Sequence, residues 1–267
     1  MKTSFNFIFL LFIAFCHAQI SICSWNLENF GKSKSPEAVT FIANTLKNYD
    51  VVAIQEVVAG NGGPQAVAKL ADALNRTGAK WEYVVSEPTS GTKYSTERYA
   101  YFWKSSKIKK IGKASLEVKY AKLIDREPFV ITFESDKKQF TVVSFHAIPK
   151  GKQPETEIKY LKLLPDEYPD KNLIFTGDFN CPQSNQVFEP LRKLNFKPAF
   201  TKQKTSLKNA CKNSDCLASE YDNIWFSPLK IIKIKAEAIH FYSVFKTLKL
   251  AKTVSDHIPV QMEFSLK

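Results

Sequence analysis

Short apolar segments rich in β-branched and aromatic residues recur along this chain of 267 residues, and they constrain its fold more than any other feature. They predict β-strands at Ile20–Trp25, Val51–Gln55, Trp81–Ser86, Tyr99–Trp103, Phe129–Phe133, Phe140–Phe145, Leu173–Thr176, Asn223–Phe226 and Val260–Phe264. Helical periodicity separates several of them, at Pro36–Leu46, Pro64–Asn75, Glu155–Leu164 and Asn185–Leu194. Because some strands are apolar on both faces, they should be covered on both sides. The pattern predicts an α/β sandwich of packed sheets with helices outside.

The N-terminus has the composition of an export signal. An apolar run, Phe5–Phe15, is broken only by Asn6 and precedes Cys16-His17-Ala18, which suits a signal peptidase cut after Ala18. The run is too short to span a bilayer. We therefore expect residues 1–18 to be a signal peptide, residues 19–267 to form one domain, and the mature protein to be secreted or periplasmic. A retained N-terminal anchor and a lipoprotein acylated at Cys16 are the alternatives.

Export makes the remaining cysteines interpretable. Cys23, Cys181, Cys211 and Cys216 stay in the mature chain, where an oxidising compartment allows three connectivities. Cys211 and Cys216 lie close together in a polar segment and are the first choice for a disulfide, whereas Cys23 lies in an apolar run and is expected to be a buried free thiol. The alternative is that all four thiols are free. Their scattered spacing does not suit a cysteine-rich metal site.

The chain is strongly basic. Thirty-eight Lys and Arg stand against 26 Asp and Glu, a formal net charge of +12. Such a surface attracts polyanions or anionic membranes, and lysines crowd residues 104–113, 193–212 and 230–252. We expect phosphate binding that does not depend on sequence and weakens steeply with salt. The alternative is a lysine coat that only keeps the protein soluble.

Polar and ionisable residues stand at the ends of the predicted strands. Those that lie within a few residues of a strand end are Asn26, Glu56, His146, Asp178, Asn180, Asp222, Asp256 and His257. Such groups are costly to bury unless they are paired or bound to a cation. Gathered at the loop ends of a rigid β scaffold, they predict an active site.

The histidines strengthen this prediction. Once His17 is removed with the signal, His146, His240 and His257 remain, and two of the three lie at strand ends. A lone histidine at such a position is usually structural, but two in company with so many acidic and amide side chains favour proton transfer. His240 has no such neighbours and is expected to pack or to face solvent.

Six motifs in order resemble one superfamily. The segments SWNLENFG, VVAIQEV, FHAIP, TGDFNCP, EYDNI and SDHIPV are similar to the endonuclease/exonuclease/phosphatase superfamily. YVVSEPTSGTKYSTERYAYFW and DREP resemble its deoxyribonuclease I branch. The resemblance implies a four-layered α/β sandwich of two mostly antiparallel sheets flanked by helices. It also implies metal-dependent hydrolysis of DNA phosphodiesters that leaves 5′-phosphates.

The resemblance also implies a metal site. Glu56 would anchor a divalent cation with Asn26, and Asp256 would complete this site or a neighbouring one. Oxygen ligands suit Mg²⁺, with Mn²⁺ as a substitute. Ca²⁺ is the weaker candidate, because the short segment Val118–Asp125 lacks the acidic insertion that holds calcium in vertebrate relatives.

Proton transfer is assigned by the resemblance to two carboxylate–histidine pairs. These are Glu97 with His146 and Asp222 with His257, in which the carboxylate fixes the ring tautomer and raises its pKa. His257 is the predicted base and His146 the acid, or the reverse. Asp178 would orient the attacking water or bind a second metal. The alternatives are an ion pair of Glu97 with Arg98 and a turn-forming role for Asp222.

Substrate contacts complete the expected site. Asn180 would hold the scissile phosphate, Arg126 would grip a phosphate oxygen, and Tyr94 would contact the DNA. The alternative for Arg126 is an ion pair with Asp125 or Glu127. Val58 stands where deoxyribonuclease I has an arginine that enters the minor groove, so groove contacts should differ.

The sequence thus predicts a secreted, Mg²⁺-dependent endonuclease that acts on the phosphate backbone of double-stranded DNA with little sequence selectivity. We expect a monomer with no stable protein partner and no membrane span. One alternative is a phosphodiesterase or phosphatase acting on lipid or inositol phosphates with the same scaffold. Another is a non-catalytic binding module, although binding alone gives no reason to keep Glu56, His146, Asp178 and His257 together.

Overall fold

The computed structural model describes residues 19–91, 96–169 and 171–267. The expected signal peptide and Tyr94 lie outside these residues. Within them, no helix is long and apolar enough to cross a membrane.

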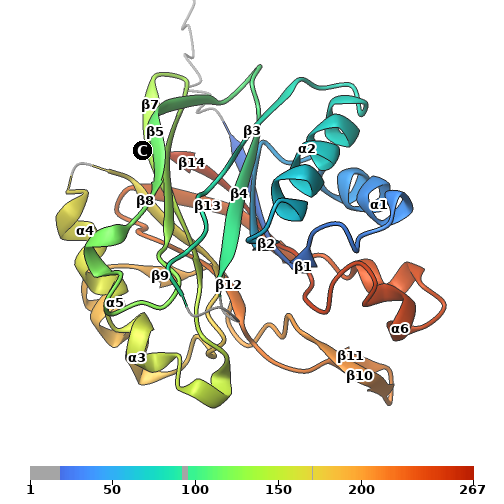
Figure 1. Cartoon of the computed structure of the whole chain (residues 1–267). Coiled ribbons are helices and arrows are strands. Elements are labelled where there is room, and N and C mark those ends of the chain that lie inside the picture. The colour runs from blue at the N-terminus through green and yellow to red at the C-terminus, as the bar shows by residue number, and fades with distance from the viewer. Residues whose placement is uncertain (1–18, 92–95, 170) are drawn as a thin grey trace, which may run out of the picture.

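Two six-stranded sheets form the centre of the molecule (Figure 1). The first has the order β13-β14-β1-β2-β4-β3, where the strands are β1 (Ile20–Phe30), β2 (Val51–Val58), β3 (Trp81–Val85), β4 (Glu97–Lys104), β13 (Ile231–Ala238) and β14 (Val260–Leu266). The second has the order β5-β6-β7-β8-β12-β9, where the strands are β5 (Lys109–Leu116), β6 (Phe129–Ser135), β7 (Lys138–His146), β8 (Leu173–Asp178), β9 (Lys197–Pro198) and β12 (Asp222–Phe226). Each sheet has one parallel pair, β1–β2 and β7–β8, and is otherwise antiparallel.

The two sheets pack face to face. Their shared core includes Ile22, Tyr101 and Met262 from the first sheet and Phe133 and Ile224 from the second, all nearly inaccessible to solvent. Apolar burial of this extent is the main stabilising term in a fold of this size.

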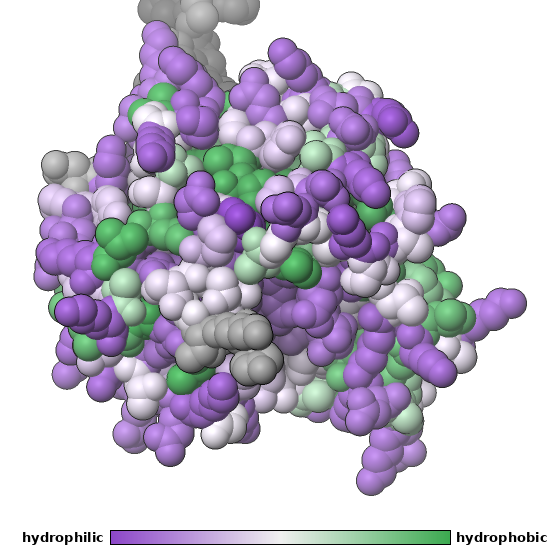
Figure 2. All heavy atoms as spheres, in the orientation of Figure 1, coloured by the Kyte–Doolittle hydropathy of each residue, from purple (hydrophilic) through white to green (hydrophobic). Residues whose placement is uncertain are grey.

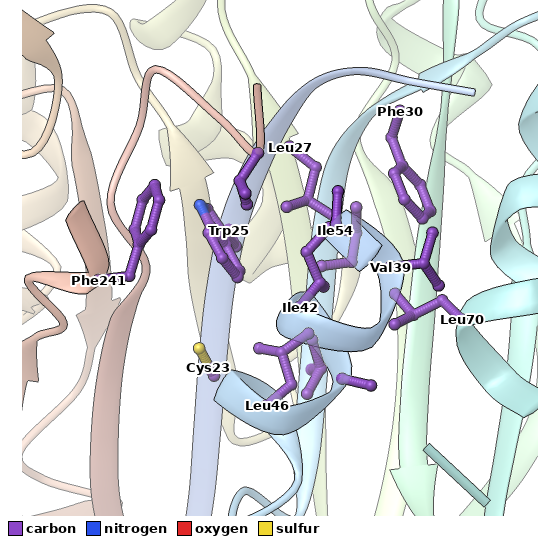
Figure 3. Packing of buried hydrophobic residues seen from close by; sticks show 14 of the residues in the cluster. Cys23, Trp25, Leu27, Phe30, Val39, Ile42, Leu46, Ile54, Leu70 and Phe241 are labelled. Carbon is purple, nitrogen blue, oxygen red and sulfur yellow. The ribbon is translucent and has the colours of Figure 1, made fainter. Parts of the chain in front are cut away.

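Helices cover both outer faces, which completes the predicted four layers. Helices α1 (Pro36–Leu46) and α2 (Gly62–Asn75) pack on the first sheet, where Ile42 and Leu70 meet Trp25 and Ile54 (Figure 3). The short helices α3 (Glu155–Ile158), α4 (Leu164–Glu167) and α5 (Glu189–Lys193) cover the second sheet. The predicted fold class is confirmed.

The structure corrects two predicted helices. Instead of one helix over Glu155–Leu164, α3 ends at Ile158, a 3₁₀ turn spans Leu161–Leu163, and α4 begins at Leu164. Instead of one helix over Asn185–Leu194, a 3₁₀ turn spans Gln186–Phe188 and α5 begins at Glu189. In both cases a proline, Pro165 or Pro190, stands near the restart. Proline has no N–H to donate to the preceding turn, so a continuous helix is broken there.

The cysteine predictions are confirmed. Cys211 and Cys216 form a disulfide that closes the hairpin of β10 (Leu207–Lys212) and β11 (Asp215–Leu217). Cys23 is a buried free thiol, and so is Cys181.

Candidate active site

The backbone is irregular at the ends of β1 and β2, and this irregularity positions the side chains of the candidate site. The register shifts between Asn26 and Phe30 on β1 and between Ile54 and Val57 on β2, and Glu56 has a φ of 59°. A bulge with a left-handed residue re-aims a side chain that regular strand geometry would place elsewhere. Glu56 consequently meets Asn26, whose Nδ2 donates to Glu56 Oε1 at 2.9 Å.

A glycine allows β7 and β8 to approach closely. Gly177 has a φ of 137°, and a Cβ at this position would lie 2.0 Å from the carbonyl oxygen of Phe145. Any other side chain would therefore push the strands apart. The register set here places His146 opposite Asp178, and Asp178 opposite Asp222 on the other neighbouring strand.

The first predicted pair is formed across the two sheets. His146 Nδ1 lies 3.0 Å from both carboxylate oxygens of Glu97, and Glu97 Oε2 also forms an ion pair with Arg126 Nε at 3.5 Å. Burial has the largest single effect and opposes protonation of the His146 ring, but the charge and hydrogen bond of Glu97 together with the charge of Asp178 outweigh it, so the pKa of His146 is raised. The positive charge of the Arg126 guanidinium lowers the pKa of His146.

The second predicted pair is formed likewise. His257 Nδ1 lies 2.7 Å from Asp222 Oδ2, and both residues are buried. Burial again opposes protonation, but Asp222 and Asp178 outweigh it and raise the pKa of His257 well above its usual value. Desolvation also raises the pKa of Asp222 despite its imidazole partner.

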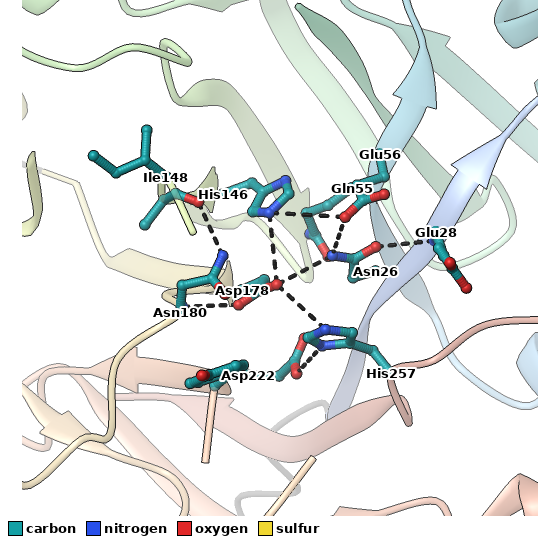
Figure 4. Close-up of polar contacts among 12 residues, drawn as sticks. Asn26, Glu28, Gln55, Glu56, His146, Ile148, Asp178, Asn180, Asp222 and His257 are labelled. Atoms are coloured by element: carbon teal, nitrogen blue, oxygen red, sulfur yellow. Dashed lines mark hydrogen bonds and ion pairs between the residues drawn. The ribbon is translucent and has the colours of Figure 1, made fainter. Parts of the chain in front are cut away.

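Asp178 joins the two pairs, as Figure 4 shows. Its Oδ2 lies 3.6 Å from His146 Nε2, 3.6 Å from His257 Nε2 and 3.1 Å from Asn26 Nδ2. The other carboxylate oxygen accepts from the backbone N–H of Asn180 at 2.8 Å. Both imidazoles therefore direct Nε2 at the same carboxylate. In this arrangement one ring can accept a proton and the other can donate one to the same small substrate group.

A set of carboxylates beside the first pair offers hard ligands for a cation. Burial would raise the pKa of Glu56, but nearby His146 and hydrogen bonds from Asn26 and Asn29 hold it below its usual range. Burial raises the pKa of Glu28, and the charges of Asp256 and Glu56 raise it further. This concentration of oxygen ligands and negative charge fits a hard divalent cation.

Asp178, Asp222 and His257 also hold possible ligand atoms within 4.8 Å of one another. In the described arrangement, however, His257 Nδ1 and Asp222 Oδ2 are already bonded to each other. We therefore interpret this group as a proton-transfer unit. The carboxylates of Glu56, Glu28 and Asp256 are the better candidates for the metal site.

Comparison with known proteins decides the family. The profile described as Endonuclease/Exonuclease/phosphatase family matches residues 23–257. The chain belongs to this family. Among structures of the same fold, a family protein from Bacteroides thetaiotaomicron has a TM-score of 0.68 at 17% identity, with 94% of this chain and 99% of the other covered.

Two of the similar proteins are named as deoxyribonucleases. Deoxyribonuclease gamma of Homo sapiens is 28% identical, with 95% of this chain and 89% of that protein covered. Deoxyribonuclease-1 of Bos taurus is 25% identical, with 91% of each chain covered. The predicted resemblance to the deoxyribonuclease I branch is confirmed.

The structure brings nearly all predicted family site residues together. Asn26, Glu56, Glu97, His146, Asp178, Asn180, Asp222 and His257 are joined by the contacts above, and Arg126 contacts Glu97. Asp256 precedes His257, and its charge acts on both His257 and Glu28. Asn26 presents its amino group to Glu56, while its oxygen accepts from the Glu28 N–H at 3.0 Å.

Sequence reasoning missed two carboxylates. Glu28 lies two residues after Asn26, and this spacing within the NLENF segment could have indicated it. Glu157, on α3, is 4% exposed and accepts from the backbone N–H groups of Asp125 at 2.5 Å and Ile148 at 2.9 Å. It thereby ties the segment that carries Arg126 to the segment that follows His146. The sequence around Glu157 resembles the exposed face of a helix, so no local pattern indicated that this carboxylate is buried.

Proposed function

We propose that this chain is a secreted, divalent-metal-dependent deoxyribonuclease that cuts double-stranded DNA with little sequence selectivity and leaves 5′-phosphates. Full-length similarity to deoxyribonucleases supports the substrate. The basic surface supports binding to a polyanion. The disulfide and the sequence of residues 1–18 support export.

The observation that carries the proposal is the pair of imidazoles around Asp178. Hydrolysis of a phosphodiester needs one proton removed from the attacking water and one delivered to the departing oxygen. His146 and His257 each direct Nε2 at Asp178 Oδ2 from 3.6 Å. Each is held in place at Nδ1 by its own carboxylate, which fixes the tautomer.

The charges around the pairs favour one division of roles. Asp178 raises the proton affinity of both rings. Arg126 counteracts Glu97 and lowers that of His146, whereas Asp222 and Asp256 both raise that of His257. A general base must be unprotonated at the working pH, and the ring with the lower proton affinity is unprotonated over a wider pH range. We therefore assign the base to His146 and the acid to His257, the reverse of the first assignment from sequence.

The remaining residues would bind substrate and metal. A cation held by Glu56, Asp256 and Asn26 would neutralise negative charge that develops on the phosphate. Asn180 is 9% exposed and donates its amide to the Ala147 carbonyl at 3.0 Å, which leaves its position fixed beside Asp178. Arg126 donates to the same carbonyl at 3.0 Å and would reach phosphate from the side of Glu97.

Plasmid nicking by residues 19–267 tests the proposal. We expect nicking with Mg²⁺, none with EDTA, and loss of activity by about 10²–10⁴-fold in His257→Ala and His146→Ala. His240→Ala is the matched control, because His240 is exposed and its side chain bonds only to Tyr242 among the described contacts. Nicks that DNA ligase can reseal would establish 5′-phosphate ends. Plasmid that stays intact while a gel shift shows it bound would contradict the proposal.

A further inference from the structure

The hairpin of β10 and β11 forms a rigid projection beside the site. It extends from the body of the molecule next to α6 (Leu248–Ala251) (Figure 1). Leu207 and Leu217 at its base are buried in one cluster with Leu248 and Ala251. The disulfide lies near its tip, and Lys252 Nζ donates to Asn209 Oδ1 at 3.2 Å. The hairpin and α6 therefore behave as one unit.

The base of this unit is joined to catalytic candidates. The backbone N–H of Leu207 donates to the Asp256 carbonyl at 2.7 Å, and Ser206 forms an isolated bridge with His257. Thr205 Oγ1 accepts from the Asp222 N–H at 2.9 Å. The base of the hairpin is thus hydrogen-bonded to the backbone that positions the second pair, Asp222 with His257.

The unit concentrates positive charge. Residues 202–217 and 246–252 contain seven lysines and one acidic residue, Asp215. Asp215 pairs with Lys204 at 3.0 Å and with Lys208 at 2.8 Å. In the described part of the chain, no carboxylate lies within ion-pair distance of the exposed Lys212 and Lys249. Polar side chains project from this part of the surface in Figure 2.

We propose that the hairpin and α6 form a second DNA-contact surface that binds backbone phosphates away from the cut. The proposal rests on the function proposed above. The six residues of β10 span about 20 Å at ~3.3 Å per residue. At ~3.4 Å per base pair, a hairpin of this length could follow a duplex for at most about six base pairs. A rigid arm with unpaired lysines suits a stiff duplex whose phosphates lie at fixed spacing.

Binding to duplexes of two lengths tests this surface. The test variant is Lys208→Gln/Lys212→Gln/Lys249→Gln. The matched control is Lys109→Gln/Lys110→Gln/Lys137→Gln, since the register of β5, β6 and β7 places these lysines at the sheet end opposite His146. Fluorescence anisotropy in EDTA measures binding without cleavage. Circular dichroism and thermal unfolding confirm that both variants fold.

For a duplex of about 30 base pairs, we expect the test variant to bind at least ~10-fold more weakly, with a salt slope reduced by about 2 to 3, and the control to bind like the wild type. For a duplex of about six base pairs, which offers fewer phosphates away from the cut, the difference between the test variant and the wild type should be smaller. Equal salt slopes in the two variants would overturn the proposal. The proposal would also be overturned if the test variant bound DNA like the wild type but bound vesicles of anionic lipid more weakly. That result would show that the surface binds membranes.

The two proposals fail in different ways. If the wild type does not nick plasmid, the proposed function is wrong. If the wild type nicks plasmid and the test variant binds the long duplex as tightly as the control does, only the hairpin inference is wrong.

Discussion

The two imidazole–carboxylate pairs have the same parts but different surroundings. Both join the two sheets, and both direct Nε2 at Asp178 from 3.6 Å. Glu97, however, shares its charge between His146 and Arg126 at 3.5 Å. Asp222 bonds to His257 at 2.7 Å, and the nearby charge of Asp178 is also negative. The pKa of His146 is therefore raised, while that of His257 is raised well above its usual value.

This difference shows that a ring's partner alone does not define its role in proton transfer. The other contacts of the partner decide how firmly the ring holds its proton. Two charges distinguish the pairs: Arg126 lowers the proton affinity of His146, and Asp256 raises that of His257.

Replacing the carboxylate that the pairs share should have the largest effect. In Asp178→Asn, both imidazoles lose a negative neighbour, and we expect turnover on DNA to fall by about 10²–10⁴-fold with folding retained. Steady-state nicking rates measure the change. Asp166→Asn, at an exposed position on α4, is the control. Turnover within about tenfold of the wild type would remove Asp178 from the mechanism.

Replacing each pair's own carboxylate should separate the two rings. In Asp222→Asn, the pKa of His257 should fall, and further than that of His146 falls in Glu97→Gln, because burial then opposes protonation with one negative charge fewer against it. An acid must be protonated, so activity is lost as pH rises through its pKa. The descending limb of the pH–rate profile should therefore move to lower pH in Asp222→Asn. NMR titration of the ring protons without metal measures both pKa values, and equal shifts would contradict the comparison.

Removing the arginine should make the first pair resemble the second. In Arg126→Gln, Glu97 keeps His146 as its charged partner, and the pKa of His146 should rise. A base must be neutral, so activity appears as pH rises through its pKa. We expect the ascending limb to move to higher pH, together with a higher KM for DNA. An ascending limb that stays in place would show that Arg126 acts on the substrate alone.

The smallest expected effect concerns the support of the first pair. In Glu157→Gln, one of the two bonds to the Asp125 and Ile148 N–H groups weakens, which should lower the free energy of unfolding by about 1–3 kcal/mol. Turnover should fall a few-fold while the pKa of His257 stays unchanged. Thermal unfolding and NMR titration check both, with exposed Glu82→Gln as the control. A shift at His257 would mean that α3 supports the whole site.

Much of the site could be predicted because its residues stand at the ends of apolar strands. The strands that carry His146 and Asp178 are buried on both faces, so their boundaries are clear in the sequence. Edge strand β5 is largely exposed and carries lysines, so it lacks the apolar pattern that predicts a strand. Edge strand β13 alternates apolar and charged residues over Ile232–Ala238, and this alternation could have predicted it.

Other features depend on contacts that no local pattern encodes. The positive φ of Glu56 arises from a bulge between paired strands, and the Arg126–Glu97 contact joins different segments. The proton affinity of each ring follows from those contacts. The direction of proton transfer could consequently not be derived from the sequence.

Cleavage of a p-nitrophenyl phosphodiester of thymidine, compared with DNA, tests the central claim most directly. A p-nitrophenolate leaving group needs no proton, so loss of the acid should matter little on this substrate. The account predicts that His257→Ala recovers most of its lost activity with the p-nitrophenyl ester, whereas His146→Ala stays impaired on both substrates. Recovery of His146→Ala instead, or equal loss of both variants on both substrates, would contradict it.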